Sequence, residues 1–426
     1  MPLKRPDSQQ HEKRSPLKLV FFRVRNAIIF FLLLSPILLY LLGNNAYMES
    51  LPIDKAPYTH FNGLDPSTQV YISWETAYQG NATLWLGASP DTLSLNQTNA
   101  TLDTIHRVQV SGLAPDTRYY YRVSSRVQGL NYTSPVGTFK TAPVTGIPFK
   151  AAFFSDAQQL WGIGHYERIA SAIAEHDDLA FVSCLGDICE FEYTQPDWNL
   201  FMLQSKGWMS KFPFVPVMGN HDTSFNDGTG SYDNMDTLMY LKYFGFSYTT
   251  GPWANHFFYS FNYSNVQFVV GEISAGGLEN ILLLNQSGWF NETLGKGQDK
   301  TFRVLMFHRC MYSSMEGSDG LVARMRPIIE KYNVSLVMYG HDHHYERFLV
   351  NGHTYLMLGG GGGIQDTGFL IRPDSQFINV GPSYTTVAYE VDRLVVETWS
   401  EENALIESFA LVANGSRAVL QRGGAC

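Results

Sequence analysis

The sequence predicts a mixed fold, with an all-β sandwich in the N-terminal part and an α/β domain behind it. From residue 57 to residue 141, short runs of alternating apolar and polar residues are separated by turn residues, and no helical period appears. From residue 149 onwards, short apolar runs alternate with helical stretches, which implies parallel strands joined by helical crossovers. The length of 426 residues also indicates two domains and an extra segment, because one ordinary core is smaller.

Composition and charge exclude some classes of protein. Apolar residues make up 45% of the chain and charged residues 16%, as in globular proteins. Residues 1–26 carry a charge of +5 and the whole chain −9, which leaves −14 on the remaining residues. Because nucleic-acid binding needs a positive surface, no nucleic-acid groove is expected.

The N-terminal segment has the pattern of a membrane anchor or a signal sequence. A basic segment at 1–26 precedes an apolar segment at 27–43, and a linker is expected at 44–56. The short apolar length and Pro36 favour a cleaved signal. The long basic stretch and the lack of a small-residue cleavage motif favour an uncleaved signal anchor, the alternative we prefer. Either alternative places the rest of the chain outside the cytoplasm, as a membrane-anchored or a secreted protein.

Nine Asn-X-Ser/Thr sequons agree with export and predict a glycoprotein with N-glycans. The sequons are at Asn81, Asn96, Asn99, Asn131, Asn262, Asn285, Asn291, Asn333 and Asn414.

The first domain is expected at 57–141. Its strands are predicted at 69–74, 83–87, 106–110 and 119–123. The run from Gly112 to Val123 resembles the corner of a fibronectin type III module, where a tyrosine fixes the turn before a core strand. A linker with two prolines and a glycine follows at 142–148.

The second domain is expected at 149–412, with a C-terminal tail at 413–426, and its active residues should lie in loops at the carboxyl ends of the strands. Residues 223–256 break the alternation and predict an insertion near the site. The predicted strands are 150–155, 179–184, 214–218, 302–307, 334–338, 385–391, 393–399 and 406–411, and the predicted helices are 165–175, 197–211 and 320–332.

Clusters of Asp, Asn and His follow five of these strands. Carboxylate, amide and imidazole ligands together suit Fe, Mn or Zn rather than Ca or Mg. Two such cations about 3.5 Å apart need a bridging carboxylate, hold a phosphate and lower the pKa of a water. The clusters are Asp156-Ala157-Gln158, Asp187-Ile188-Cys189-Glu190, Asn220-His221-Asp222, His308-Arg309 and His341-Asp342-His343.

The order of these clusters resembles that of the calcineurin-like metallophosphoesterases. The fibronectin-like domain and the run at 340–347, Gly-His-Asp-His-His-Tyr-Glu-Arg, resemble the purple acid phosphatases in particular. The resemblance covers residues 57–411 and implies a four-layer α/β/β/α sandwich for the second domain. It also implies two metal ions, of Fe, Mn or Zn, and an acid phosphatase-like phosphomonoesterase whose substrate is a phosphorylated small molecule or another phosphoester.

The resemblance assigns roles to individual residues. It implies that His221 faces the substrate phosphate as an electrophile or a general acid, and that Asp222 orients it. Together with the bridging Asp187, these two residues form the expected catalytic set. Further candidates for substrate contact are Arg309, Tyr312 and His344. The expected metal ligands are Asp156 and His343 for one ion, Asn220, His308 and His341 for the other, and Asp187 for both.

Two positions depart from the family pattern. Purple acid phosphatases carry an iron-binding tyrosine three residues after the bridging aspartate, where this chain has Glu190. Other metallophosphoesterases carry a histidine two residues after the first aspartate, where this chain has Gln158. The first metal therefore lacks a ligand unless Glu190, Gln158 or a water supplies it. Without a tyrosinate we expect no purple charge-transfer band, and Mn, Fe(II) or Zn rather than Fe(III).

Two alternatives to a phosphomonoesterase stay open. A phosphodiesterase or nucleotide pyrophosphatase of the same fold differs only in the shape of its pocket. A surface binding protein with an impaired metal site would explain the changes at Gln158 and Glu190, although the other ligands are retained.

The cysteines give no disulfide framework and no zinc pattern. A disulfide between Cys189 and Cys310, which both flank the clusters, and buried free thiols are both open.

Overall fold

The structure is a computed structural model of the chain, and it describes residues 55–159, 164–191, 194–222, 238–245, 257–273, 279–414 and 417–420. The basic segment at 1–26, the apolar segment at 27–43 and almost all of the linker at 44–56 lie outside the described residues, as does most of the insertion at 223–256. In the part of the chain that is described, no helix is both long and apolar enough to cross a membrane.

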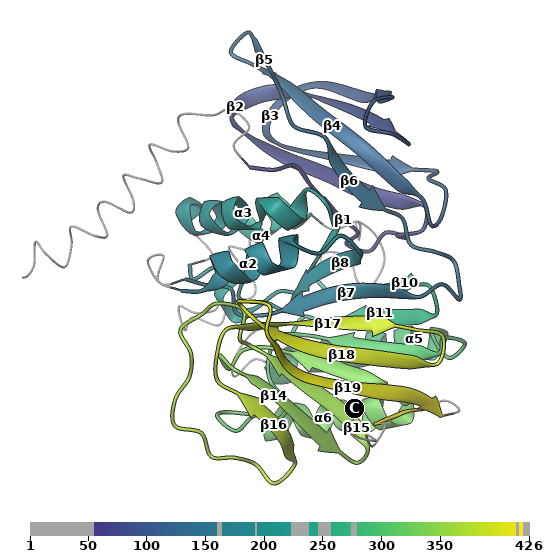
Figure 1. The fold of residues 1–426 in the computed structure, drawn as a ribbon, viewed down its shortest axis with the longest axis vertical. Coiled ribbons are helices and arrows are strands. Elements are labelled where there is room, and N and C mark those ends of the chain that lie inside the picture. Colours follow the sequence, from purple (N-terminus) through teal and green to yellow (C-terminus); the bar gives the residue numbers. More distant parts are fainter. Residues whose placement is uncertain are drawn as a thin grey trace, which may run out of the picture. The chain divides into compact units, whose positions relative to one another are not determined.

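The N-terminal domain consists of strands (Figure 1), and its first strand also contacts the following domain. Strand β2 pairs with both β3 and β4, and it contains two of the predicted strands in one long element. Val70, Ile72 and Trp74 alternate along β2 and are completely buried, as the period of a half-buried strand requires. The predicted all-β sandwich is confirmed. The strands are β1 (Tyr58–His60), β2 (Gln69–Gly87), β3 (Ser94–Ser111), β4 (Arg118–Val127), β5 (Leu130–Thr133) and β6 (Gly137–Lys140).

The predicted tyrosine corner is present at the start of β4. The hydroxyl of Tyr119 accepts a hydrogen bond of 3.0 Å from the backbone N–H of Ala114. This bond closes the turn that precedes the core strand, as in fibronectin type III modules.

The second domain contains two mixed sheets. In the first, β7, β8 and β9 run parallel, and β17 to β20 continue it antiparallel from the other edge of β7. The single pair of His60 with Phe214 joins β9 to β1, so this sheet continues into the sandwich. The strands are β7 (Phe149–Phe154), β8 (Leu179–Cys184), β9 (Phe214–Pro216), β17 (Ser383–Tyr389), β18 (Arg393–Ser400), β19 (Leu405–Asn414) and β20 (Arg417–Leu420).

The second sheet has the order β10-β11-β12-β13-β15-β14-β16. Strands β11, β12, β13 and β15 run parallel, and the strands at both edges are antiparallel. The strands are β10 (Tyr259–Tyr263), β11 (Val266–Val270), β12 (Phe302–Met306), β13 (Leu336–Tyr339), β14 (Tyr345–Val350), β15 (His353–Leu358) and β16 (Ser375–Asn379).

The two sheets enclose the main core, and helices cover their outer faces. Phe181 of β8 meets Phe268 of β11 edge-on at 5.2 Å between ring centroids, in a cluster that draws side chains from both sheets. A second cluster lies between the first sheet and its helices, and a third between the second sheet and its helices. The four-layer α/β/β/α sandwich is confirmed. The helices are α2 (Tyr166–Ala174), α3 (Gln195–Met209) and α4 (Leu238–Phe244) on the first sheet, and α5 (Glu279–Lys296) and α6 (Asp319–Lys331) on the second.

A buried ion cluster ties β2 to α4. The carboxylate of Glu75 accepts hydrogen bonds from the ammonium groups of Lys55 and Lys242 and, at 2.8 Å, from the hydroxyl of Tyr243. Burial alone would raise the pKa of Glu75, but the two ammonium groups outweigh it and lower this pKa below its usual range. The insertion is thus anchored on the N-terminal domain at this point.

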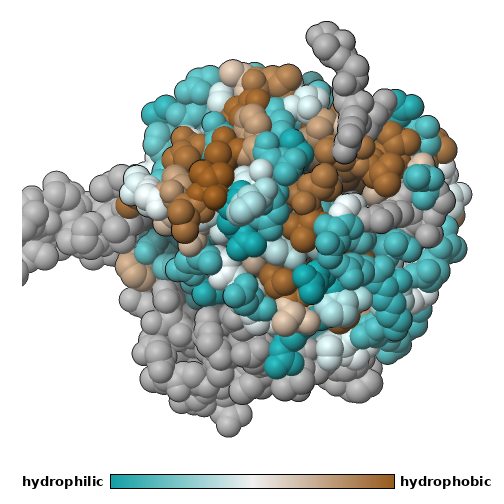
Figure 2. Space-filling view, turned by 90° about the horizontal axis from the view of Figure 1, so that it is seen from below, coloured by the Kyte–Doolittle hydropathy of each residue, from teal (hydrophilic) through white to brown (hydrophobic). Residues whose placement is uncertain are grey.

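Large exposed apolar side chains are scattered over the surface. Figure 2 shows hydrophobic residues in separate groups among hydrophilic ones on one face of the molecule. Ile364, Leu370 and Ile371 are all exposed and come from the one loop between β15 and β16, which also contacts the candidate site described below.

Candidate metal centre

The five clusters of the sequence come together at the carboxyl ends of parallel strands of both sheets. Neighbouring loops are joined through their backbones: the N–H of Asp156 donates to Gly186, and the N–H of Gly340 donates to His308. The tight loops require glycine here. A Cβ on Gly219 would lie 2.1 Å from the backbone nitrogen of Asp187, closer than real contacts allow.

Three of the predicted ligands have a left-handed backbone conformation. The φ angles are 62° at Asp156, 52° at Asp187 and 84° at His341. Such conformations cost on the order of 1–3 kcal/mol each in non-glycine residues, and they cluster where a site imposes a geometry. The backbone therefore directs these side chains toward one point at the expense of local stability.

A first group of donor atoms surrounds the side chain of Asn220. Its Oδ1 lies 3.0 Å from Nε2 of His308 and 3.0 Å from Nδ1 of His341. Nε2 of His308 lies 3.2 Å from Oδ2 of Asp187, and the ligand atoms of Asp187, His308 and His341 lie within 4.8 Å of one another. Ligands bound to one cation at about 2.1 Å lie roughly 3.0–3.4 Å apart, so this group has the spacing of a metal site.

A second group lies on the other side of Asp187. Nε2 of His343 is 3.7 Å from Oδ1 of Asp156 and 3.1 Å from Nε2 of Gln158. The same Gln158 nitrogen is 3.4 Å from Oδ2 of Asp187, which also faces His308. The carboxylate of Asp187 thus contacts both groups, as a bridging ligand must.

Each of the three histidines holds its other ring nitrogen against an acceptor. Nδ1 of His308 donates to the carbonyl of Leu185 at 2.9 Å, and Nδ1 of His343 donates to the carbonyl of Ile364 at 2.7 Å. Nε2 of His341 donates to the carboxylate of Glu316 at 3.3 Å. Metal-binding histidines are oriented in this way, which leaves the lone pair of the second nitrogen for the metal. The residues present therefore fit divalent transition metals.

His221 lies beside both groups. Its backbone N–H donates to Oδ1 of Asp187 at 2.8 Å, and its Nδ1 donates to the carbonyl of Glu190 at 2.9 Å. Burial lowers the pKa of His221, but the negative charge of Asp187 and the Glu190 carbonyl outweigh it, so that the pKa is raised. In the neutral ring the lone pair is on Nε2, because Nδ1 must carry a proton to face a carbonyl.

The side chain of Asp222 binds the backbone of two neighbouring loops. The buried carboxylate of Asp222 accepts from the backbone N–H groups of Gly219 at 2.8 Å and Ile188 at 2.9 Å. Burial, and then the negative charge of Asp187, raise the pKa of Asp222 to about 7. Asp222 therefore joins the loops after β8 and β9, and its expected role in orienting His221 stays a prediction.

Glu190 lies beside His221, and its assignment as a metal ligand stays a prediction. Its carboxylate is 3.9 Å from Nδ1 of His221 and also interacts electrostatically with Asp187 and His343. Burial raises its pKa.

Arg309 remains beside the site. Its guanidinium donates to Oε2 of Glu316 at 3.3 Å, the same carboxylate oxygen that accepts from His341. Sequence reasoning did not single out Glu316, which also forms a candidate ligand group with His341 and Asp342. No motif marks it, because it follows His308 in a loop of irregular structure.

Tyr312 and His344 are corrected from substrate contacts to buried structural residues. Tyr312 is 4% exposed, and its ring packs edge-on against Tyr355 at 4.9 Å. His344 is completely buried, and its Nε2 contacts the carboxylate of Glu346 at 3.0 Å. Adjacent residues that enter a strand point to opposite sides, so His343 faces the site and His344 faces the interior.

The cysteines of the described region form no disulfide with one another. Cys184, Cys189 and Cys310 are all buried. The sulfur of Cys189 faces the carbonyl of His221 at 3.7 Å, and that of Cys310 faces Asp342 at 3.8 Å. The disulfide alternative is therefore excluded for Cys189 and Cys310, and Cys426 lies outside the described residues.

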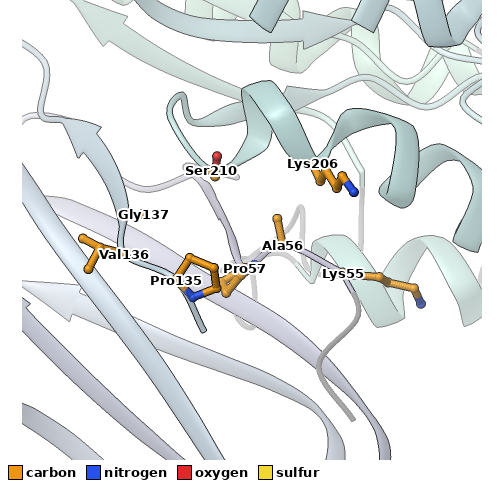
Figure 3. A pocket seen from close by; sticks show the side chains of 8 residues that line it. All are labelled: Lys55, Ala56, Pro57, Pro135, Val136, Gly137, Lys206 and Ser210. Carbon is orange, nitrogen blue, oxygen red and sulfur yellow. The ribbon is translucent and has the colours of Figure 1, made fainter. Parts of the chain in front are cut away.

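A separate cavity of about 300 Å³ lies where the end of helix α3 meets the start of strand β6 (Figure 3). None of the predicted site residues lines it. Its walls are Lys55, Ala56, Pro57, Pro135, Val136, Gly137, Lys206 and Ser210.

Comparisons with known proteins agree with this site. Residues 149–345 match the family Calcineurin-like phosphoesterase, and residues 57–141 match the family Purple acid Phosphatase, N-terminal domain. Purple acid phosphatase 22 of Arabidopsis thaliana is 26% identical over 258 residues, which are 57% of this chain and 54% of that protein. An uncharacterized protein of Mycobacterium tuberculosis is 24% identical over 327 residues, which are 67% of this chain and 60% of that protein. The chain thus spans less than two thirds of the length of these two relatives.

A solved structure shares the fold. The purple acid phosphatase PPD1 from yellow lupin (Lupinus luteus) seeds superposes with a TM-score of 0.69 at 18% identity, over 84% of this chain and 75% of that one. Together, the two matched families, the relatives and this fold confirm the resemblance seen in the sequence. The chain contains a calcineurin-like phosphoesterase domain at residues 149–345, preceded at residues 57–141 by an N-terminal domain of the purple acid phosphatase type.

Proposed function

We propose that the protein is a phosphoric ester hydrolase with two metal ions, acting as an acid phosphatase-like phosphomonoesterase. The observation that carries this proposal is the pair of donor groups that share Asp187, with His221 beside them. When bound, two cations would hold the phosphate and lower the pKa of a water. The family supports hydrolysis of phosphoesters, and its members depend on metal ions.

Four residues of the chain would have separate roles in the reaction. Asp187 holds the two donor groups together, and Asp222 fixes the loops that present them. His221 exchanges a proton with the leaving oxygen through Nε2, because its Nδ1 is held by the Glu190 carbonyl. Arg309 lies at the rim, where its guanidinium would attract the negative charge of the substrate.

Hydrolysis of two chromogenic esters tests the substrate class. The chelator-treated full chain is reloaded with Mn²⁺, Fe²⁺ or Zn²⁺ and given p-nitrophenyl phosphate or bis(p-nitrophenyl) phosphate. A phosphomonoesterase prefers the first ester, whereas a preference for the second would support the phosphodiesterase alternative. No turnover of either ester with any metal would leave the binding-protein alternative.

We propose further that the protein acts outside the cytoplasm and is held at a membrane by its N-terminal segment. The basic and apolar pattern of residues 1–43 supports this proposal. Eight of the nine sequon asparagines have described side chains, and none of these eight is buried. Expression in a glycosylating host tests it: the proposal requires the chain to stay in the membrane pellet after carbonate extraction and to lose mass on glycosidase treatment.

A further inference from the structure

We infer that Gln158 is a metal ligand, and that its side-chain oxygen supplies the ligand missing from the family pattern at Glu190. The inference rests on the proposed metal-dependent function and names a residue of this chain that neither branch of the family uses in this way.

The first observation is an unsatisfied oxygen. Gln158 is 4% exposed, and its Oε1 is buried without a hydrogen-bond partner. Buried polar atoms in folded proteins almost always have a partner, and a group that lacks one calls for an ion, a water or a function. The main chain that carries this side chain is tied to the next loop, because the backbone N–H of Gln158 donates to the carbonyl of Asp187 at 3.2 Å.

The second observation is where the amide group lies. Its nitrogen is 3.1 Å from Nε2 of His343 and 3.4 Å from Oδ2 of Asp187. A half-turn of the amide exchanges nitrogen for oxygen without a change of shape, since the two ends have the same size and differ only in hydrogen-bonding character. The oxygen then occupies a corner between two expected ligands, at the separations that ligands of one cation have.

Hydrogen bonding explains the orientation that the amide of Gln158 has in the structure. Nδ1 of His343 donates to the carbonyl of Ile364, so Nε2 of the neutral ring is an acceptor. The nitrogen of Gln158 can donate to this acceptor and to Asp187, whereas its oxygen cannot. A cation that takes the lone pair of His343 removes this preference.

Glu190 does not compete for the position. Its carboxylate faces His221, and the backbone carbonyl of the same residue holds Nδ1 of that ring. A shift of Glu190 toward His343 would break the contact with His221. The neutral amide of Gln158 already lies at this position and needs no such shift.

An amide oxygen changes the charge around the metal. The donors near His343 then comprise the carboxylates of Asp156 and Asp187, one imidazole and a neutral oxygen, with no tyrosinate. Fewer negative ligands stabilise a trivalent ion less, so this position favours Mn²⁺, Fe²⁺ or Zn²⁺.

Titration of the chelator-treated full chain with Mn²⁺, followed by the electron paramagnetic resonance signal of free Mn²⁺, tests the inference. We expect two sites in the unmodified chain. Gln158→Leu, which fills most of the same space and removes the amide oxygen and nitrogen, should weaken one site at least tenfold and leave the other within threefold. Gln158→Glu should retain both sites, because it retains an oxygen at the same place. Glu190→Gln is the matched control and should bind two Mn²⁺ with unchanged affinity.

A thermal melt of the metal-free variants separates a ligand from a structural residue. Gln158→Leu should melt within a few degrees of the unmodified chain, because it removes an unsatisfied buried oxygen along with the two hydrogen bonds of the amide nitrogen. Two Mn²⁺ sites of unchanged affinity in Gln158→Leu, or loss of a site in Glu190→Gln, would overturn the inference while the proposed function stands. Absence of any Mn²⁺ binding by the unmodified chain, together with absence of turnover, would overturn both.

Discussion

Oδ2 of Asp187 lies 3.2 Å from Nε2 of His308, and both side chains are buried. These residues are far apart in the sequence, in the loops that follow β8 and β12 of different sheets, and these loops meet at the candidate metal centre. The contact therefore links the two halves of the second domain at the candidate metal centre. A change at either residue should affect both donor groups.

The glycine before His341 should be indispensable to the site. A Cβ at Gly340 would lie 1.9 Å from Oγ of Ser155 and 2.4 Å from Oδ2 of Asp156. We expect Gly340→Ala to lower turnover of p-nitrophenyl phosphate about 100-fold, because a misplacement near 1 Å has effects of that size. Gly381→Ala, where the nearest atom is 3.6 Å away, is the control and should be within twofold of the unmodified chain. Equal activity of the two variants would contradict the tight packing of this loop.

Tyr312 and Arg309 should differ in their effect on substrate binding. Tyr312 is buried against Tyr355, so Tyr312→Phe should leave KM and kcat within twofold. Arg309 lies at the rim with its guanidinium on Glu316, so Arg309→Ala should raise KM about tenfold with a smaller effect on kcat. Steady-state kinetics of both variants measure this difference. A raised KM in Tyr312→Phe would show that Tyr312 contacts the substrate.

The buried ion cluster of Glu75 should contribute strongly to stability. Removal of its carboxylate leaves Lys55 and Lys242 without their shared partner, and broken buried pairs cost about 3–5 kcal/mol. Urea unfolding of Glu75→Ala should show a loss of this order. Glu292→Ala removes the exposed pair with Lys296 on helix α5 and should cost no more than about 1 kcal/mol. Similar losses in the two variants would contradict the burial of the cluster.

Glu272 should make the protein less stable as the pH rises. Its carboxyl group is buried, and burial raises its pKa from 4.5 to about 7. A carboxyl group whose pKa is raised in the folded state stabilises the fold below its unfolded pKa and loses this contribution as the pH rises through the folded value. The contribution of Glu272 to the free energy of unfolding should therefore fall by on the order of 3 kcal/mol between pH 4.5 and 7.

Glu272→Gln isolates this effect, because it keeps the shape of the side chain and cannot ionise. The difference in unfolding free energy between this variant and the unmodified chain should grow over the same pH range and be constant above it. Glu402→Gln, at an exposed position, provides the comparison. A difference that does not change with pH would show that Glu272 titrates at its ordinary value.

Much of the fold was predictable because the periods of the sequence reflect burial. The alternation in β2 and the apolar runs at β7, β8 and β12 predicted strands that the structure contains. Helix α5 was missed, since Gly288 and Gly295 interrupt a sequence of weak helical period. Its side chains Trp289, Phe290 and Leu294 pack in the core beneath the second sheet, and this tertiary contact outweighs the low propensity.

The sequence motifs predict the expected metal ligands of the candidate site, but not the residues that contact these ligands. Asp187 and His308 belong to motifs whose order along the chain is that of the family. Glu316 belongs to no motif and contacts His341 because of the path of an irregular loop. His344 follows His343 in the sequence. Their roles differ because their side chains point to opposite sides where the chain enters β14. The role of Gln158 depends on where its amide lies relative to His343, which no spacing along the chain determines.

The most direct test of the account is the metal content of the purified full chain, measured by mass spectrometry beside its turnover of p-nitrophenyl phosphate. We expect two metal ions per chain with turnover, and loss of both in Asp187→Asn, which keeps the shape of the residue shared by the two donor groups. One metal ion or none, with no turnover after reloading with Mn²⁺, Fe²⁺ or Zn²⁺, would contradict a two-metal phosphoesterase. Two metal ions and full turnover in Asp187→Asn would contradict the bridging role of Asp187.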